Sequence, residues 1–347
     1  MPIYGQRVVM PEPFRVEVEA FEVPEPGPDQ LLIETEASAI SAGTELAVYT
    51  GVHQWLNDPT RSWPRFPFVP GYSAVGRVTA LGEGVSTYQV GQRVVYDGRH
   101  TTHGLVDLAA DRALIYPIAA HVPAEHAAFA AIARFPFTAV VQSGVTAGQS
   151  VAVLGLGVIG QVALRLFAAC GAFPLVGIDS VASRRAVAAS SPGVTALDLE
   201  DTAMREQLHA ANHGQAPDIV VEATGNPQAV KLAMALVADG GKVVMVGSPR
   251  GIAGEVDFYW DLHGRSIQLI GAHGSAIGGT PREKFPYVRD RAMRLLVHFL
   301  ESGKLRLDDI VTHYAHADAS AQMYDGLLNR RDEFLGVSLH WGSIRSS

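Results

Sequence analysis

Cysteine is almost absent from this chain of 347 residues, in which Cys170 is the single example. One cysteine forms no internal disulfide, and it does not supply the several closely spaced thiolates that a multi-thiolate zinc cluster needs. Cys170 ends the apolar segment "LRLFAAC", so we expect it to be a small buried core residue.

Positive charge is also scarce. The chain has 27 Lys and Arg against 35 Asp and Glu, a formal net charge of −8, and therefore lacks the cationic footprint of a nucleic-acid-binding protein. None of the four lysines follows a tyrosine by four residues, so the Tyr-x-x-x-Lys pair of short-chain dehydrogenases is missing; the lysines are Lys231, Lys242, Lys284 and Lys304.

Long hydrophobic runs are missing as well. The longest uninterrupted one covers residues 127–133, well below the roughly 18 residues that span a bilayer. The opening "MPIYGQRVVM" has no apolar core of a signal peptide. We therefore expect a soluble, cytoplasmic protein with no membrane partner.

The hydrophobic pattern changes once along the chain. Up to about residue 120, short β-like alternations are interrupted by Gly and Pro, which is typical of an all-β partial barrel. After Pro123, residues 124–147 look helical, and apolar strand-like runs then alternate with helical segments. This alternation predicts βαβ units around a parallel sheet, and with 48% hydrophobic residues the length favours two domains.

A glycine motif follows the first of these apolar runs. Gly155, Gly157 and Gly160 form G-x-G-x-x-G between the strand-like "SVAVL" and an amphipathic helix. The first glycine permits a tight turn, the second lets the backbone approach a pyrophosphate, and the third allows close packing of helix and strand. We predict that this loop binds a dinucleotide, with the remaining contacts from Leu156, Val158 and Ile159.

An acidic residue stands where the next strand should end. Asp179 lies about 20 residues beyond the glycines, the place from which a carboxylate accepts the ribose hydroxyls of NAD and repels a 2′-phosphate. Arg184 and Arg185 follow closely, and an arginine there could instead bind the 2′-phosphate of NADP. The predicted cofactor is NAD, with NADP as the alternative.

With these motifs in order along the chain, the sequence resembles the medium-chain dehydrogenase/reductases. The segments that carry the resemblance are "AISAGTELAVYTG", "VPGYSAVGRVTALGEGVSTYQVGQRV", "PDIVVEATGNPQAV", "GGKVVMVG" and "GKLRLDDIVTHY" to "GVSLH". The resemblance implies an α/β fold with a GroES-like catalytic domain, discontinuous over residues 1–122 and 273–347, and a Rossmann doubly wound cofactor domain over 123–272. It also implies cofactor contacts at Thr224, Val246 and Gly247, and a homodimer through "SIQLIGA".

The sequence departs from the zinc-dependent members of that family. The position of their first ligand, a cysteine, falls on Ser41 or Ala42, and their His-Glu pair falls on Tyr72 and Ser73. The third ligand position falls on Ala131. None of these side chains is a good zinc ligand, and the four-cysteine structural lobe is missing, so we expect no metal site.

Without a metal, other side chains must handle the proton of an alcohol. The resemblance implies that Thr44 hydrogen-bonds the reacting oxygen. Tyr72, at the position of the histidine ligand, is either a catalytic phenol or a packing residue, and a phenol acting as a base needs a cationic or hydrogen-bonding neighbour. His53 and His103 are the candidates for that neighbour or for the base itself. Two other candidates each have a structural alternative. Glu45 is either a catalytic acid or base or a cap in the first turn of a helix. Arg134 either binds an anionic substrate or pairs with a carboxylate of the protein.

These observations predict a zinc-independent, NAD-dependent oxidoreductase that interconverts a secondary alcohol and a ketone. Within the family, "ISAGTE" and "VPGYSAVGRV" are similar to dehydrogenases of the bacteriochlorophyllide 3-hydroxyethyl type. The substrate stays open between an apolar, an aromatic and a sugar-like alcohol, because several aromatic residues are expected near the cleft with Tyr72: Trp55, Trp63, Phe66 and Phe68. The alternatives are a zinc-free, NADPH-dependent quinone or enone reductase and a dinucleotide-binding protein without catalysis.

Overall fold

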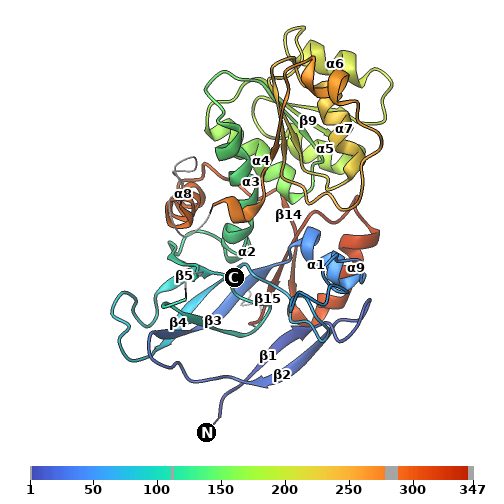
Figure 1. Cartoon of the computed structure of the whole chain (residues 1–347). Coiled ribbons are helices and arrows are strands. Elements are labelled where there is room, and N and C mark those ends of the chain that lie inside the picture. The colour runs from blue at the N-terminus through green and yellow to red at the C-terminus, as the bar shows by residue number, and fades with distance from the viewer. Residues whose placement is uncertain (1, 111–112, 278–287, 343–347) are drawn as a thin grey trace. The chain divides into compact units, whose positions relative to one another are not determined.

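The computed structural model describes residues 2–110, 113–277 and 288–342 (Figure 1). The chain divides into two compact units, which are described separately below. The β-rich unit runs to Ile132 and also includes Met293–Gly303 and the chain from Val311 onward, and the parallel-sheet unit comprises Ala133–Ala292 and Lys304–Ile310.

The predicted domain boundaries, at residues 122 and 272, lie earlier in the chain than these divisions. At the first, helix α3 (Ala130–Ser143) continues across the change of unit. At the second, the chain beyond residue 272 still packs within the parallel-sheet unit, because a Cβ on Gly274 would lie 2.4 Å from the ring of Phe135.

The β-rich unit contains a hairpin and a larger sheet (Figure 1). Its strands are β1 (Tyr4–Val9), β2 (Glu17–Glu22), β3 (Gln30–Ala39), β4 (Ala74–Leu81), β5 (Arg93–Tyr96), β6 (His103–Asp107), β7 (Ile115–Pro117), β14 (Val311–His316) and β15 (Gly336–His340). The larger sheet has the order β14-β15-β3-β4-β5-β7, with β6 also paired to β3, and β1 pairs with β2 alone. The C-terminal segment thus returns to this unit and adds two strands.

Strand β3 is the centre of that sheet and leads directly to the candidate site. It pairs antiparallel with β4, β6 and β15. Leu31 and Ile33 are fully buried in a cluster with side chains of β4 and β5, as the apolar alternation predicts. After a short bend the chain enters helix α1 (Ala42–Tyr49), which packs near helix α9 (Ser320–Asn329).

The parallel-sheet unit has the strand order β10-β9-β8-β11-β12-β13, and every neighbouring pair is parallel. The strands are β8 (Val151–Leu154), β9 (Leu175–Asp179), β10 (Val194–Asp198), β11 (Ile219–Glu222), β12 (Lys242–Met245) and β13 (Gln268–Gly271). The helices between them are α4 (Val158–Ala169), α5 (Ala182–Ala189), α6 (Met204–Ala211) and α7 (Pro227–Leu236). This is the predicted doubly wound arrangement, whose order reverses between β8 and β11.

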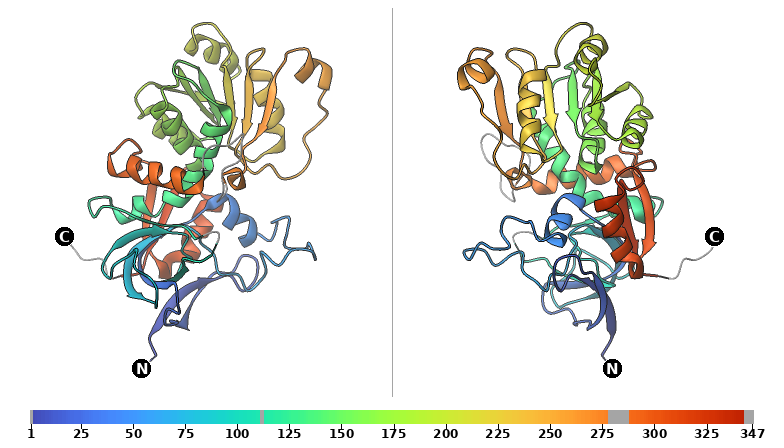
Figure 2. Two further views of the ribbon diagram at one scale, coloured as in Figure 1. Left: turned by 60° about the vertical axis from the view of Figure 1, so that its left-hand side comes forward. Right: turned by 90° about the vertical axis from the view of Figure 1, so that its right-hand side faces the viewer.

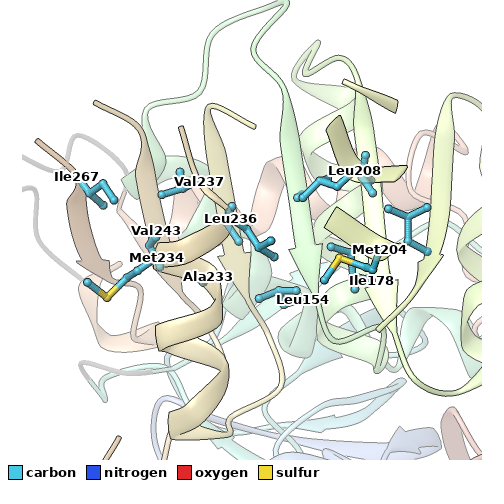
Figure 3. Close-up of a cluster of buried hydrophobic side chains, with 14 residues drawn as sticks. Leu154, Ile178, Met204, Leu208, Ala233, Met234, Leu236, Val237, Val243 and Ile267 are labelled. Atoms are coloured by element: carbon cyan, nitrogen blue, oxygen red, sulfur yellow. The ribbon is translucent and has the colours of Figure 1, made fainter. Parts of the chain in front are cut away.

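Burial explains why the strand sequences of this unit are continuously apolar. Helices lie along the sheet in both views of Figure 2, and all four residues of β8 are buried. Figure 3 shows the core along one face, where Leu154 and Ile178 of the strands meet Leu208 of α6 and Met234 of α7.

Two local predictions differ from the structure, and one element is not predicted by the sequence. The helix expected over 124–147 is divided into α2 (Ala124–Ala127) and α3, which ends at Ser143. Cys170 is exposed, because α4 ends at Ala169 and Cys170 is its C-cap residue. A π-helix at Phe258–His263, which the apolar pattern does not indicate, precedes β13.

Two further features concern expected partners. Strand β13 pairs with β12 and has no other partner strand in the described ranges, so one edge of it is open, and the homodimer stays a prediction.

Across the portion of the chain with described structure, no helix combines the length and the apolar content needed to cross a membrane.

The remaining helical segments complete the chain. They are helix α8 (Arg289–Glu301) and two short 3-10 turns at Gly274–Ala276 and Ala317–Ala319.

Candidate functional site

The glycine loop between β8 and α4 has the geometry that its motif predicts. Gly155 adopts a left-handed φ of +88°, and a Cβ there would lie 2.7 Å from a side-chain carbon of Thr224. A Cβ on Gly160 would lie 1.8 Å from the carbonyl oxygen of Gly155, so only glycine fits. Gly157 is the N-cap residue of α4, and a Cβ placed on it would have no other atom within 4 Å. The loop therefore leaves room for a ligand at the helix N-terminus, where an anion is favoured.

Asp179 braces this loop from the end of β9. Its Oδ2 accepts the N–H of Leu156 at 2.7 Å and its Oδ1 accepts the N–H of Val181 at 2.8 Å. Arg185 donates to the carbonyl of Asp179 at 2.9 Å and forms an ion pair with Asp198 at 2.6 Å. The carboxylate thus lies beside the glycine loop, and its contact with the cofactor ribose stays a prediction. Arg185 is engaged in holding the end of β9 and β10 together.

Sequence reasoning missed Glu222, the last residue of β11, which organises the next loop. Its side chain is fully buried, and its Oε1 accepts the N–H of Thr224 at 2.7 Å and that of Gly225 at 2.9 Å. Its backbone carbonyl accepts the N–H groups of Val246 and Gly247 at 2.9 and 2.8 Å. Burial raises the pKa of this carboxyl group. Three predicted cofactor residues are therefore brought together by one acidic residue.

The two loops meet at the point where the strand order reverses. Gly155 follows β8 and contacts Thr224, which follows the neighbouring strand β11. In doubly wound sheets, ligands bind outside the carboxyl ends of the strands at this reversal. The residues present fit a dinucleotide: a glycine loop at a helix N-terminus, an open position at Gly157, and a carboxylate one strand away.

A second group of predicted residues gathers in the β-rich unit. The hydroxyl groups of Ser41 and Tyr72 are hydrogen-bonded to each other. Ser73 is buried, and its hydroxyl donates to the carbonyl of Ala128. Ala131 is buried too. The former ligand positions are thus occupied by neutral hydroxyl groups already bonded to protein atoms, and by a methyl group.

Tyr72, the partner of the Ser41 hydroxyl, borders a pocket of about 240 Å³. Thr44 and Tyr72 lie in its lining with Glu45. The other lining residues are Trp63, Phe68, Gly71, Asp97 and Arg99. The pocket combines aromatic surface, two hydroxyl groups and groups of both charges, which is a suitable lining for a small polar molecule.

Glu45 lies on the first turn of α1 but is not an exposed cap. It is 1% exposed, and its Oε1 accepts the N–H of Ser41 at 2.9 Å. Its Oε2 accepts the hydroxyl of Tyr324 and lies 3.0 Å from Nε2 of His100. His100 is fully buried, and its Nδ1 lies 2.8 Å from the hydroxyl of Ser38. Sequence reasoning missed His100, Tyr324 and Ser38.

Two predicted histidines lie outside this group. His53 is 6% exposed and its ring packs edge-on against Trp55 and Trp63, with ring centroids 5.5 and 5.3 Å away. It therefore supports an aromatic wall of the pocket and is not itself in the lining. His103 lines a different pocket, of about 370 Å³, and burial lowers its pKa.

The predicted arginines take different places. Arg134 belongs to the parallel-sheet unit, where its guanidinium group lies 5.3 Å from the ring centroid of Phe135. Arg184, on α5, accepts a hydrogen bond from the side chain of Gln161 through its backbone carbonyl at 2.8 Å. Gln161 is itself fully buried on α4, so this contact joins the two helices that follow the glycine loop and Asp179.

Comparison with protein families matches both parts of the chain. Residues 27–144 match the alcohol dehydrogenase GroES-like domain, and residues 158–292 match the zinc-binding dehydrogenase family. Together these matches cover more than two thirds of the chain.

Individual relatives agree with this assignment. The chain is 24% identical to erythritol/L-threitol dehydrogenase of Mycolicibacterium smegmatis over 90% of its own length and 91% of the relative. It is 25% identical to L-threonine 3-dehydrogenase of Thermococcus kodakarensis, covering 90% and 88%. Its fold is similar to that of 2R,3R-butanediol dehydrogenase from Bacillus subtilis, with a TM-score of 0.82 and 19% identity over 97% and 100% of the two chains.

The glycine loop at the switch point of a doubly wound sheet and the β-rich unit completed by C-terminal strands agree with both family matches. The chain therefore belongs to the medium-chain, zinc-type dehydrogenase family, and it is an oxidoreductase of the alcohol dehydrogenase class.

Proposed function

We propose that the protein is a zinc-independent, NAD-dependent oxidoreductase that interconverts a small secondary alcohol and its ketone. The observation that carries the proposal is the hydroxyl pair of Ser41 and Tyr72, whose Tyr72 member lines a pocket together with Thr44. This arrangement provides oxygen atoms that exchange protons in place of the thiolate and imidazole ligands that a catalytic zinc ion requires.

The donor set of this site does not fit zinc. Ser41 and Tyr72 are neutral hydroxyl groups bonded to each other, and Ser73 is bonded to a backbone carbonyl. Among residues 2–110, 113–277 and 288–342, no three His, Cys, Asp or Glu side chains come together in a way that could hold a metal ion. The zinc-binding name of the family thus disagrees with the chemistry of these side chains.

The residues of the parallel-sheet unit support NAD as the cofactor. Gly157 leaves open space at the N-terminus of α4 for the pyrophosphate, and Asp179 presents a carboxylate where a 2′-phosphate would be repelled. Bound NAD supplies the acceptor for the hydride that leaves the carbinol carbon. The loop held by Glu222, with Thr224 and Gly247, contributes the remaining cofactor contacts.

The side chains of the β-rich unit handle the oxygen of the substrate. The Thr44 hydroxyl binds the reacting oxygen, and the hydroxyl pair of Tyr72 and Ser41 accepts the alcohol proton and releases a proton to solvent. The overall reaction converts the alcohol and NAD⁺ into the ketone, NADH and one proton. Holding the reactants in place contributes the larger part of the rate increase.

The pocket also favours a class of substrate. Its volume of about 240 Å³ suits a small molecule, and Asp97 and Arg99 in its lining favour a polar or charged substituent beside the carbinol. The relatives named above act on erythritol or threitol, on threonine and on butanediol, all of which are small alcohols with a second polar group. We therefore propose a small secondary alcohol with a polar neighbouring group.

A substrate panel tests the proposed function. Purified protein is assayed by NADH absorbance with polyols, hydroxy amino acids and diols, each with NAD and with NADP, and enones are tested with NADPH. We expect turnover of at least one polar secondary alcohol, with kcat/KM for NAD exceeding that for NADP because Asp179 repels a 2′-phosphate. Reduction of enones alone, or a preference for NADP, would contradict the proposal, and inactivity throughout would favour a non-catalytic dinucleotide-binding protein.

A further inference from the structure

A buried acid and a buried histidine lie behind the hydroxyl pair. Glu45 and His100 are 1% and 0% exposed, and Oε2 of Glu45 lies 3.0 Å from Nε2 of His100. Tyr324 is also fully buried and donates to the same carboxylate oxygen. Burial and the adjacent carboxylate hold the pKa of Tyr324 well above its ordinary value, so Tyr324 stays protonated and remains a donor.

Such a pair needs a reason to be buried. A carboxylate taken out of water loses its hydration, and this cost is offset only when hydrogen-bond donors and an opposite charge surround it. Glu45 has hydrogen-bond partners on both of its oxygens, because Oε1 receives the Ser41 N–H and Oε2 receives the Tyr324 hydroxyl and faces Nε2 of His100. His100 is fixed in turn by Ser38, which lies 2.8 Å from its Nδ1. Every contact therefore holds the two side chains in a single arrangement.

Glu45 contacts the chain segment that carries Ser41, and His100 contacts the segment that carries Tyr72. Glu45 accepts the N–H of Ser41, so it fixes the backbone from which the Ser41 hydroxyl extends. The backbone of His100 packs against Gly71, the residue before Tyr72. A Cβ on Gly71, whose φ is +95°, would lie 2.6 Å from the nitrogen of His100. The acid and the histidine thus brace the two chain segments that bring the hydroxyl groups together.

We propose that Glu45 and His100 are positioning residues for proton transfer, which hold the hydroxyl groups of Ser41 and Tyr72 in contact beside the substrate pocket. This proposal rests on the proposed function, since it assigns these residues a role in that reaction. Neither residue is assigned the transfer itself. Their effect is on the alignment of the two groups that accept and release the proton, and misplacement by about 1 Å commonly costs about 10²-fold in rate.

The test uses Glu45→Gln and His100→Asn in the full-length protein. Glu45→Gln removes the carboxyl group and His100→Asn removes the imidazole, each with a small change in side-chain volume. We expect kcat to fall by about 10²-fold in both variants. The KM for NAD should stay within about 2-fold, because the glycine loop and Asp179 belong to the other unit. Tyr96→Phe is the matched control. It removes a buried phenol hydroxyl that bonds Thr35 at 2.6 Å in the same unit, and it should leave kcat unchanged.

The pH dependence of kcat gives a readout that a purely structural role would not move. We expect its profile to shift in Glu45→Gln and to stay at the wild-type position in Tyr96→Phe. Titratable groups near the pair include Tyr324 and Tyr49, whose ring centroids lie 5.7 Å apart, and the residues that share the pocket lining with Glu45, which are Tyr72, Asp97 and Arg99. Burial, and secondly the charge of Asp325, raises the pKa of Tyr49. Ser38 and Ser41, which also contact the pair, carry no charge.

The outcomes separate this role from the proposed function. An inactive wild-type protein contradicts the function, whereas an active wild type with equally active variants contradicts the positioning role. Crystal structures of the two variants provide a readout that needs no turnover, since we expect the Ser41 and Tyr72 hydroxyl groups to move apart. An unchanged hydroxyl contact in both variants would overturn the inference.

Discussion

Replacing Tyr72 by phenylalanine is expected to lower kcat/KM for the alcohol by about 10²- to 10³-fold, with little change in the affinity for NAD. The phenol hydroxyl is the partner of the Ser41 hydroxyl and lies in the lining of the pocket with Thr44. Phenylalanine keeps the ring and removes only the oxygen that exchanges a proton. Steady-state kinetics with varied alcohol and saturating NAD measure the change.

Thr44→Val completes this experiment, because the same mechanism assigns the substrate oxygen to the Thr44 hydroxyl. We expect a decrease of similar size. Thr79→Val, on strand β4, is the matched control, since its hydroxyl donates to the carbonyl of Leu32 at 3.3 Å and is not in the lining of the pocket. Wild-type kcat/KM in both Tyr72→Phe and Thr44→Val would remove the assignment of the catalytic residues.

Alanine is expected to destabilise the protein at one glycine of the cofactor loop and to leave its stability unchanged at another. In Gly160→Ala the new Cβ would lie 1.8 Å from the carbonyl oxygen of Gly155. Neither group is a flexible side chain, so the loop must shift, and we expect a loss of about 1–3 kcal/mol of stability together with at least about 10-fold weaker NAD binding. In Gly157→Ala the Cβ meets nothing within 4 Å, so stability should stay near that of the wild type.

Gly157→Ala then isolates the contact with the cofactor. Its backbone, with φ of −65° and ψ of −177°, is accessible to any residue, so weaker NAD binding in this variant reports a ligand that approaches the Gly157 backbone. Thermal unfolding and fluorescence titration with NAD measure the two quantities separately. Wild-type stability and affinity in Gly160→Ala would contradict the packing argument, and unchanged affinity in Gly157→Ala would contradict the placement of the pyrophosphate.

The parts of the site that the sequence predicts are those held within short segments. Gly155, Gly157 and Gly160 lie in one turn whose strand and helix have clear apolar periodicity, and Asp179 ends the next strand. The structural surroundings of these residues are therefore predictable from the neighbouring sequence. The fold class follows in the same way, because buried parallel strands are recognisable as continuous apolar runs.

The residues that sequence reasoning missed depend on contacts between distant segments. Tyr324 contacts Glu45 across 279 positions of the chain, and His100 contacts it across 55. Nothing in the pattern around either residue distinguishes a buried partner from an exposed side chain. One local signal existed for Glu222, since an acidic residue at the end of an apolar strand must have donors if it is buried.

The roles of His53 and Glu45 also depend on contacts between distant segments, which the local sequence pattern does not predict. Both were plausible by residue type, but the structure packs His53 against Trp55 and Trp63 and turns Glu45 inward to Ser41. Their orientation depends on the loop that follows α1 and on the return of the C-terminal segment to the β-rich unit. Periodicity within a single element does not contain that information.

The most direct test of the account is the zinc content of catalytically active protein, measured on the same sample before and after dialysis against a chelator. The hydroxyl groups of Ser41, Tyr72 and Ser73 predict well under one zinc ion per chain and an unchanged kcat after dialysis. One zinc ion per chain, whose removal abolishes turnover and whose return restores it, would contradict the account.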